Sequence, residues 1–296
     1  MIDSLAAVPP WTRFREFIAP GADRFAILKE LIEEAGLEYR IITIAGNRHF
    51  FIAPPRPEEE YLRRRPTIIT AHYDRSQGSP GANDNSAAVF ILLETAGKLR
   101  REKTYNWMVI FTDKEELKSG EGITDQGAYT LAEAMRETEL ETSRIFNFDA
   151  CGTGDTLLIS TTAEYLLKNE KAAGEKIRTN IKELREAALE TARDLRMAKV
   201  LLAPTPLSDD AGFLRAGITA QTITMLPAEE CTLLVSMLRR TPDYTEALVN
   251  LELRNAYDHR SIPETWRIFN SPSDSHLRLT PGNFRIVGRF AEALCK

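Results

Sequence analysis

Apolar residues along the chain gather in short runs that alternate with longer amphipathic stretches. Three runs are almost wholly apolar and lie at about 67–71, 106–112 and 145–149. Continuously apolar runs of this length, separated by helical patterns, are typical of strands that are buried on both faces. The pattern therefore predicts an α/β fold with a mixed, mostly parallel central sheet and helices on both faces.

The N-terminal part of the chain predicts helices followed by a hairpin. The stretch "ADRFAILKELIEEAG" has a helical spacing of apolar residues and a stop signal at Gly36. "YRIITIAG" and "RHFFIA" flank the turn at Gly46 and Asn47, and their alternation indicates an outer antiparallel hairpin. We therefore expect a helical and hairpin region at about 1–55, within a single domain that spans 1–296.

Two later segments also look helical. The stretch at about 163–197 predicts one packed amphipathic helix from apolar residues at spacings of three to four: Ile177, Ile181, Leu184, Ala188 and Leu195. The segment at about 227–268 contains "EECTLLVSMLRR" and "DYTEALVNLEL", and we interpret it as an insertion. It either caps a site or forms a subunit contact in a homo-oligomer.

Composition narrows the classes of function. The chain has 296 residues, 43% of them hydrophobic, which is enough for one large core. The net charge is −5 with acidic and basic residues interspersed, so the sequence predicts neither a nucleic-acid partner nor a membrane partner. Three widely spaced cysteines without a CxxC pattern, and no visible export signal, favour a cytoplasmic protein with reduced thiols.

Potential metal-binding side chains follow the first apolar run. The run ends at His72 and Asp74, and after a loop rich in Gly, Pro and Ser, Asp84 precedes an amphipathic helix. An imidazole nitrogen and a carboxylate are ordinary zinc ligands, and a second carboxylate often holds the imidazole from behind. We expect His72 and Asp84 to bind metal and Asp74 to orient the histidine ring.

Further carboxylates follow the other two apolar runs. Glu115 and Glu116 come after "NWMVIFTDK", and Asp149 ends "SRIFNFD". Adjacent side chains in extended chain point in opposite directions, so one glutamate can bind metal while the other takes a proton from water. Carboxylates that share a desolvated site repel one another unless a cation is present. These residues therefore favour a divalent metal site.

The motifs together resemble the co-catalytic di-zinc aminopeptidase family, which also contains glutamate carboxypeptidase-like enzymes and one-zinc glutaminyl cyclases. The similarity covers roughly 66–226 and 268–294, and its motifs occur in the family's order: "AHYD", "GANDNSAAV", "FTDKEEL", "FNFDACGTGD", "SDDAGFLRAGI" and "NSPSD". The resemblance implies the sheet fold described above and an activity that removes an N-terminal residue from a peptide or cleaves a small amide.

The resemblance also implies a role for each matching residue. His72 and Asp149 would bind one metal, and Asp84 would bridge two metals and precede a cis peptide bond. Glu116 would bind the second metal, and Glu115 would be the catalytic general base. In "SDDAGFLRAG", the alternatives are that Ser208 or Asp209 caps a helix or that the motif acts in the site.

One position departs from the family pattern. Asn270 stands where the family usually has a histidine that completes the second metal's ligands, and an amide oxygen is a poorer zinc ligand. Only His49, His259 and His276 remain as replacements for this histidine. We retain Asn270 itself as a candidate contact for metal or substrate. We expect one firmly bound zinc ion and a second ion that is weak or absent, with manganese or cobalt as alternatives.

Two other functions stay open at this point. Because the second metal's histidine is missing, the chain is alternatively a catalytically impaired, peptidase-like binding protein. A third interpretation is a single-zinc acyl-transfer enzyme of the glutaminyl cyclase kind. The resemblance argues against it, because it suggests that such enzymes keep the metal bound by the glutamate and the histidine, and this chain has lost that histidine.

Overall fold

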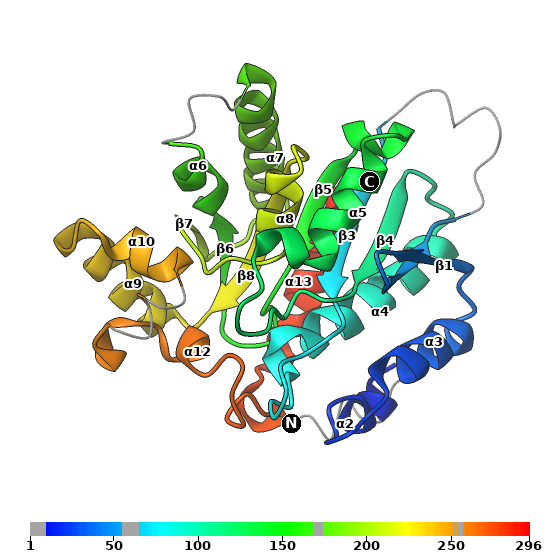
Figure 1. Ribbon diagram of the computed structural model, residues 1–296. Coiled ribbons are helices and arrows are strands. Elements are labelled where there is room, and N and C mark those ends of the chain that lie inside the picture. Colours follow the sequence, from blue (N-terminus) through cyan, green and yellow to red (C-terminus); the bar gives the residue numbers. More distant parts are fainter. Residues whose placement is uncertain (1–9, 55–64, 169–173, 251–252, 254–256) are drawn as a thin grey trace.

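An eight-stranded sheet forms the centre of the molecule (Figure 1). The computed structural model describes residues 10–54, 65–168, 174–250, 253 and 257–296. The strands are β1 Tyr39–Ile44, β2 Asn47–Ile52, β3 Thr67–His72, β4 Trp107–Thr112, β5 Arg144–Phe148, β6 Thr156–Ser160, β7 Val200–Ala203 and β8 Ala220–Leu226. Their order across the sheet is β1-β2-β4-β3-β5-β8-β6-β7.

The pairing of the strands confirms the predicted mixed sheet. β3 is parallel to both β4 and β5, β5 is parallel to β8, and β6 is parallel to β7. The hairpin β1–β2 is antiparallel and lies at one edge, as its alternation predicts, and β6 runs antiparallel to β8. The three apolar runs at 67–71, 106–112 and 145–149 are β3, β4 and β5.

Helices cover both faces of this sheet. The main helices are α3 Arg24–Glu34, α4 Ala87–Arg101, α5 Gly127–Met135, α7 Glu175–Asp194, α8 Asp209–Arg215, α9 Ala228–Arg240 and α13 Phe284–Leu294. Along β3, Ile69 packs in the core that includes residues of α4, α7 and α13, whereas Ile68 packs with α5 and α8. Because neighbouring strand residues point to opposite faces, a strand covered on both sides must be apolar throughout.

The predicted single helix at 163–197 is wrong as one element. The chain forms α6 Thr162–Leu166 and then α7, and residues 169–173 between them lie outside the described part of the chain. Gly174, which precedes α7, has a ψ of 151°, an extended conformation that cannot continue a helix. The amphipathic pattern itself is confirmed in α7, where Ile181, Leu184 and Ala188 are buried.

The segment at 227–268 builds a third apolar cluster. Besides α9 it forms α10 Tyr244–Val249 and α12 Glu264–Arg267, and Figure 1 shows these helices grouped beside the edge of the sheet that carries β6 and β7. Leu234, Tyr244 and Trp266 pack there against residues from β6 and β8. No helix in the described ranges is both long enough and apolar enough to cross a membrane.

Candidate metal centre

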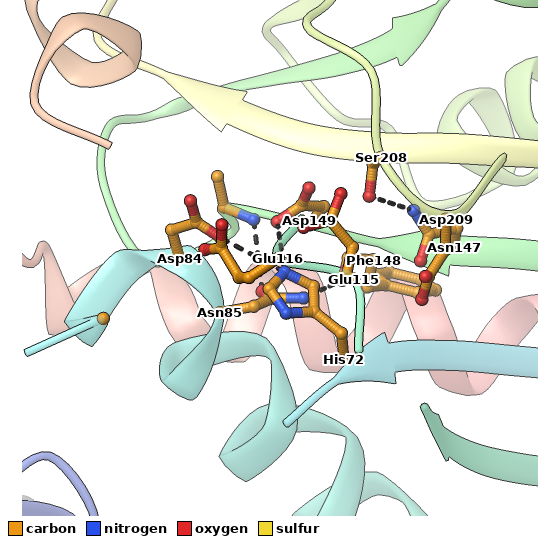
Figure 2. A network of polar contacts seen from close by, with 12 residues as sticks. His72, Asp84, Asn85, Glu115, Glu116, Asn147, Phe148, Asp149, Ser208 and Asp209 are labelled. Carbon is orange, nitrogen blue, oxygen red and sulfur yellow. Dashed lines mark hydrogen bonds and ion pairs between the residues drawn. The ribbon is translucent and has the colours of Figure 1, made fainter. Parts of the chain in front are cut away.

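The side chains singled out in the sequence meet at the carboxyl end of three adjacent strands. His72 is the last residue of β3, Asp149 directly follows β5, and Glu115 and Glu116 lie in the loop after β4. Asp84 lies in the turn Ala82–Ser86 that precedes α4. Because β4, β3 and β5 are neighbours in the sheet, their ends bring these side chains together, as Figure 2 shows.

Three of these residues form a buried group that can hold a metal ion. The ligand atoms of His72, Asp84 and Asp149 all lie within 4.8 Å of one another. The Nε2 atom of His72 is 3.1 Å from Asp84 Oδ1 and 3.6 Å from Asp149 Oδ1. Neither His72 Nε2 nor Asp149 Oδ1 has a hydrogen bond of acceptable geometry, although both atoms are buried. A cation between these atoms would satisfy them, so the donor set fits a metal.

Asp74 contacts the other side of the histidine ring. Its Oδ1 lies 3.2 Å from His72 Nδ1, which leaves Nε2 directed at the site. The same carboxylate accepts the backbone N–H of Glu115 at 3.1 Å and that of Glu116 at 3.0 Å. This is the contact expected of a carboxylate that supports a metal-binding imidazole. Asp74 therefore fixes the imidazole and the glutamate pair relative to each other.

The two glutamates have different partners. Gln126 Nε2 lies 3.3 Å from Glu115 Oε1, and the Ser76 hydroxyl donates to Glu116 Oε2 at 2.8 Å. Burial raises the pKa of Glu116 to about 8, and the Asp84 carboxylate adds to this effect. Burial also raises the pKa of Glu115 well above its usual range, with further contributions from Glu116 and Asp149. A cation in the site would lower both pKa values.

The charge on His72 is favoured by the same carboxylates. Its burial opposes protonation, but the nearby carboxylates of Asp149, Asp74 and Asp84 together raise its pKa well above the usual value. A raised pKa means that a proton competes with a metal ion for this imidazole.

The loop that carries Asp84 is held by a residue whose role the sequence did not reveal. The peptide bond between Asp84 and Asn85 is cis, which confirms the expectation drawn from the family. Asp274, fully buried, accepts the backbone N–H groups of Asn83 at 2.8 Å and Asp84 at 3.0 Å. Asp274 belongs to the quoted "NSPSD" motif, but it lies 190 residues from Asp84, so no local pattern links the two.

Asn270 lies on the wall of a cavity that Asp84 and Asp149 also line. It is exposed and has a left-handed backbone with a φ of 60°. The cavity has a volume of about 180 Å³ and contains the carboxylates of Asp84, Glu115, Glu116 and Asp149. Its remaining walls are mostly apolar, and they comprise Leu117, Ile123, Gln126, Pro206, Leu207, Leu248, Val249 and Phe269. Leu248 and Val249 belong to α10, so the segment at 227–268 contributes to this wall.

Within the described ranges, neither His49 nor His276 joins a group of three or more potential metal ligands. His49 is buried, its Nδ1 accepts the backbone N–H of Asp113 at 3.2 Å, and burial lowers its pKa to about 4. His276 lies in the turn His276–Arg278. The side chain of His259 lies outside the described part of the chain.

The expectation that Ser208 or Asp209 caps a helix by its side chain is wrong. Ser208 does precede α8, but its side chain makes no capping hydrogen bond. Instead its hydroxyl accepts from Asn147 Nδ2 at 2.8 Å, and Asp209 accepts from the Thr112 hydroxyl. Burial raises the pKa of Asp209 to about 7. The motif thus adds a buried acid near the glutamates.

Comparisons with known proteins agree with this geometry. Residues 54–283 match the family described as Peptidase family M28. A Zn-dependent exopeptidase from Parabacteroides distasonis is 15% identical, with a TM-score of 0.62 over 100% of this chain and 98% of that one. A glutaminyl cyclase from Porphyromonas gingivalis is also 15% identical, with a TM-score of 0.62 over 99% and 97%. The comparison with curated proteins found no match.

A zinc aminopeptidase from Bacillus subtilis is 19% identical, with a TM-score of 0.54 over 83% of this chain and 49% of that chain. The present chain thus spans about half the length of that relative. At these identities the solved structures show a shared fold alone. The family match, by contrast, covers more than half of the sequence and includes all the residues of the candidate site. The chain therefore belongs to peptidase family M28.

Proposed function

We propose that the protein is a zinc-dependent, aminopeptidase-like hydrolase that removes an N-terminal residue from a peptide or cleaves a small amide. The observation that carries this proposal is the meeting of His72, Asp84 and Asp149 with two glutamates at one cavity. Hydrolysis by a metal-activated water requires a set of metal ligands and, beside it, a carboxylate that can take a proton from that water.

The donor set favours zinc at the first position. One imidazole nitrogen and two carboxylates leave room for a further ligand, which is the pattern of catalytic zinc sites. A bound zinc ion would supply Lewis-acid polarisation of the scissile carbonyl and would lower the pKa of water at the site. Manganese or cobalt would fit the same nitrogen and oxygen ligands.

Glu115 is the group that we assign to proton transfer. Gln126 lies against one of its carboxylate oxygens, so the other oxygen remains for water in the cavity. Glu115 would take a proton from the attacking water and later donate it to the leaving amine. The backbone N–H of Glu115 donates to Asp74, so the backbone of this residue is tied to the carboxylate that contacts His72.

The cavity suggests how substrate binds. The four carboxylate-bearing residues that line the cavity favour a positively charged N-terminal amine. The apolar residues of the lining, including Leu207, Leu248 and Phe269, suit an apolar side chain. A volume of about 180 Å³ accommodates one residue rather than a long peptide segment, which agrees with cleavage near an end.

We further propose that the first ion is held firmly and the second weakly. A second ion would share Asp84 and bind Glu116, whose Oε1 is buried without a hydrogen-bond partner. Asn270 is the nearby residue that matches the family's histidine position, and it is exposed. An amide in an exposed loop is a weak substitute for an imidazole.

Asn270 also supports the second candidate function, a protein that binds peptides without hydrolysing them. The retained Glu115 argues against it, because a binding site has no need of a buried general base. The acyl-transfer alternative receives no support from Asn270. The resemblance suggests that such enzymes keep the metal whose histidine is replaced by Asn270 here.

Metal analysis combined with activity assays distinguishes these functions. Purified protein is measured for zinc content and then assayed on aminoacyl amides, short peptides and N-terminal glutaminyl peptides, with and without added zinc. Hydrolysis that is lost on chelation supports the proposal. Metal binding without any turnover supports the binding protein, and cyclisation of glutaminyl peptides supports the acyl-transfer enzyme.

A further inference from the structure

The loop that joins β3 to α4 carries both Asp74 and Asp84, and it is contacted by helices that precede the family-matched residues. The match begins at residue 54, whereas α2 Phe14–Phe17 and α3 lie before it. Figure 1 shows α2 and α3 at the end of the sheet where this loop emerges. The N-terminal helices therefore lie next to the loop that carries the proposed metal ligand Asp84 and its neighbour Asp74.

Arg24, the first residue of α3, reaches into the loop. Its side chain is buried, with only 6% of the residue exposed. Its Nη1 donates to the backbone oxygen of Asp74 at 2.7 Å, and its Nη2 donates to the hydroxyl of Ser86. That hydroxyl donates in turn to the backbone oxygen of Gly81. One guanidinium thus joins the two ends of the loop, beside Asp74 and just after Asp84.

Arg75 connects the same loop to the N-terminal helices in the opposite direction. Its Nη2 donates to the backbone oxygen of Ala19 at 2.7 Å, and its Nη1 donates to those of Ile18 at 2.9 Å and Pro80 at 3.3 Å. Two arginines, one from the helices and one from the loop, therefore hold the loop and the helices together. Planar guanidinium groups are suited to such multiple contacts, whereas a lysine ammonium is not.

The loop has little room to adjust around Arg24. Gly81 has a φ of 58°, and a Cβ atom there would lie 2.7 Å from the backbone oxygen of Asp84 and 3.4 Å from Arg24 Nη1. The guanidinium also lies over the ring of Phe17, with its Cζ 4.2 Å from the ring centroid. Close packing on both sides fixes the position of the guanidinium, and through it the loop backbone.

The charge of Arg24 complements the site as well. The guanidinium interacts favourably with the carboxylates of Asp74, Asp84 and Asp274. A buried cation behind these acids offsets part of their mutual repulsion before any metal binds. A buried charge is stable only when it is paired, so the arginine and the acids depend on each other.

We propose that Arg24 is a positioning residue of the metal site, which holds the loop so that Asp74 supports His72 and Asp84 faces it. The inference rests on the proposed function, because it takes His72, Asp84 and Asp149 as the metal ligands. It extends the metal site to a helix that lies outside the family-matched part of the chain.

The test compares Arg24→Met, Arg24→Lys and a matched control, Arg13→Met, in the full chain. Arg13 also lies among the N-terminal helices, where it pairs with Glu16 at 2.7 Å, Glu30 at 2.8 Å and Glu34 at 3.1 Å. No contact between Arg13 and the loop that joins β3 to α4 is present among the described residues. Zinc affinity is measured by competition with a chromophoric chelator, and the absorption spectrum of cobalt-substituted protein reports ligand geometry.

We expect Arg24→Met to weaken zinc binding by about 10- to 100-fold, the usual range for groups that orient metal ligands. The cobalt spectrum should change in the same variant. Arg24→Lys keeps the charge but cannot join both ends of the loop, so its affinity should lie between those of Arg24→Met and wild type. Arg13→Met should match wild type in zinc affinity and in cobalt spectrum.

Three results would overturn the inference. Wild-type affinity and spectrum in Arg24→Met would remove the role of Arg24 while leaving the proposed metal site intact. An equal loss in Arg13→Met would show that general stability of the helices is responsible. No zinc binding by the wild-type protein would contradict the proposed function and this inference together. If Arg24→Met does not fold, Arg24→Lys with wild-type affinity and spectrum gives the first of these results.

Discussion

The two halves of the candidate site differ in how firmly their side chains are held. On one side, His72 is fully buried between Asp74 and the carboxylates of Asp84 and Asp149. On the other side, Glu116 accepts a hydrogen bond from Ser76 and lines the same cavity as Asn270, which is exposed. In our proposal, a well-formed metal position thus lies beside a weakened one.

The difference has a structural origin. His72 and Asp149 lie at the ends of β3 and β5, two strands that pair directly, so the sheet fixes their separation. Asn270 follows the short helix α12 and has a left-handed backbone, and no strand supports it. Positions on rigid elements are more precise than positions on loops. The first metal position is thus the part of the site that the fold itself builds.

The largest expected effect concerns the proton-transfer group, which both halves share. Glu115→Gln should lower the turnover rate by about two to four orders of magnitude, because an amide keeps the shape of the side chain but cannot accept the proton. Zinc content should stay near that of wild type, since Glu115 is not a proposed ligand. Steady-state kinetics and metal analysis on the same preparation measure both quantities.

Glu121→Gln is the matched control for this variant. Glu121 lies in the same loop region but is paired with Lys114 and does not line the cavity. Its loss should leave turnover unchanged. Wild-type hydrolysis by Glu115→Gln would show that another group takes the proton.

The next largest effect should come from the firmly held half. His72→Ala removes a ligand, and it should weaken zinc binding by more than the roughly 10- to 100-fold expected for a supporting residue such as Asp74 in Asp74→Asn. Competition titrations rank the two variants. A smaller loss in His72→Ala than in Asp74→Asn would contradict the assignment of His72 as a ligand.

Much of the candidate site could be predicted from the sequence. His72, Asp84, Glu115, Glu116 and Asp149 each follow an apolar run or precede a helix, and parallel strands bring such ends together. Asp74 lies two residues from His72, so its support of the ring was a local inference. The order of the motifs then connected them to a family.

The parts that sequence missed depend on contacts between distant residues. Arg24 lies 50 residues before Asp74, and neither residue marks the other in any local pattern. The strands β6, β7 and β8 were not predicted, and β7 has only four residues with partly exposed positions, so its pattern is weak. The break before α7 followed from the conformation of Gly174, which an amphipathic pattern does not record.

A smaller effect should appear in the dependence of stability on pH. In the metal-free protein, burial raises the pKa of Glu116 from 4.5 to about 8 and that of Asp209 to about 7. The raised pKa of His72 acts in the same direction. The folded protein then holds protons that the unfolded chain has released, so its free energy of unfolding falls as pH rises from about 4.5 to about 8.

Thermal melts of chelated and zinc-loaded protein measure this effect. The chelated protein should melt several degrees lower at pH 8 than at pH 5.5, because one pKa unit is worth about 1.4 kcal/mol and roughly 1 kcal/mol corresponds to about 2–4 °C in domains of 150–250 residues. Zinc should reduce the fall, since the cation stabilises the ionised carboxylates. A melting temperature of the chelated protein that rises over this range would contradict the buried, unneutralised cluster.

The smallest expected effect comes from repairing the weaker half. Asn270→His should increase the affinity for a second ion by at least about 10-fold, because an imidazole is a better zinc ligand than an amide. Histidine tolerates the left-handed backbone of this position better than most residues do. Metal titration should then approach two ions per chain where wild type holds nearer one, and added zinc, manganese or cobalt should raise wild-type activity more than that of the variant. Two tightly bound ions in wild type would show that another residue, such as His259, completes the site. A second ion in Asn270→His without any hydrolysis would favour the peptide-binding protein over the enzyme.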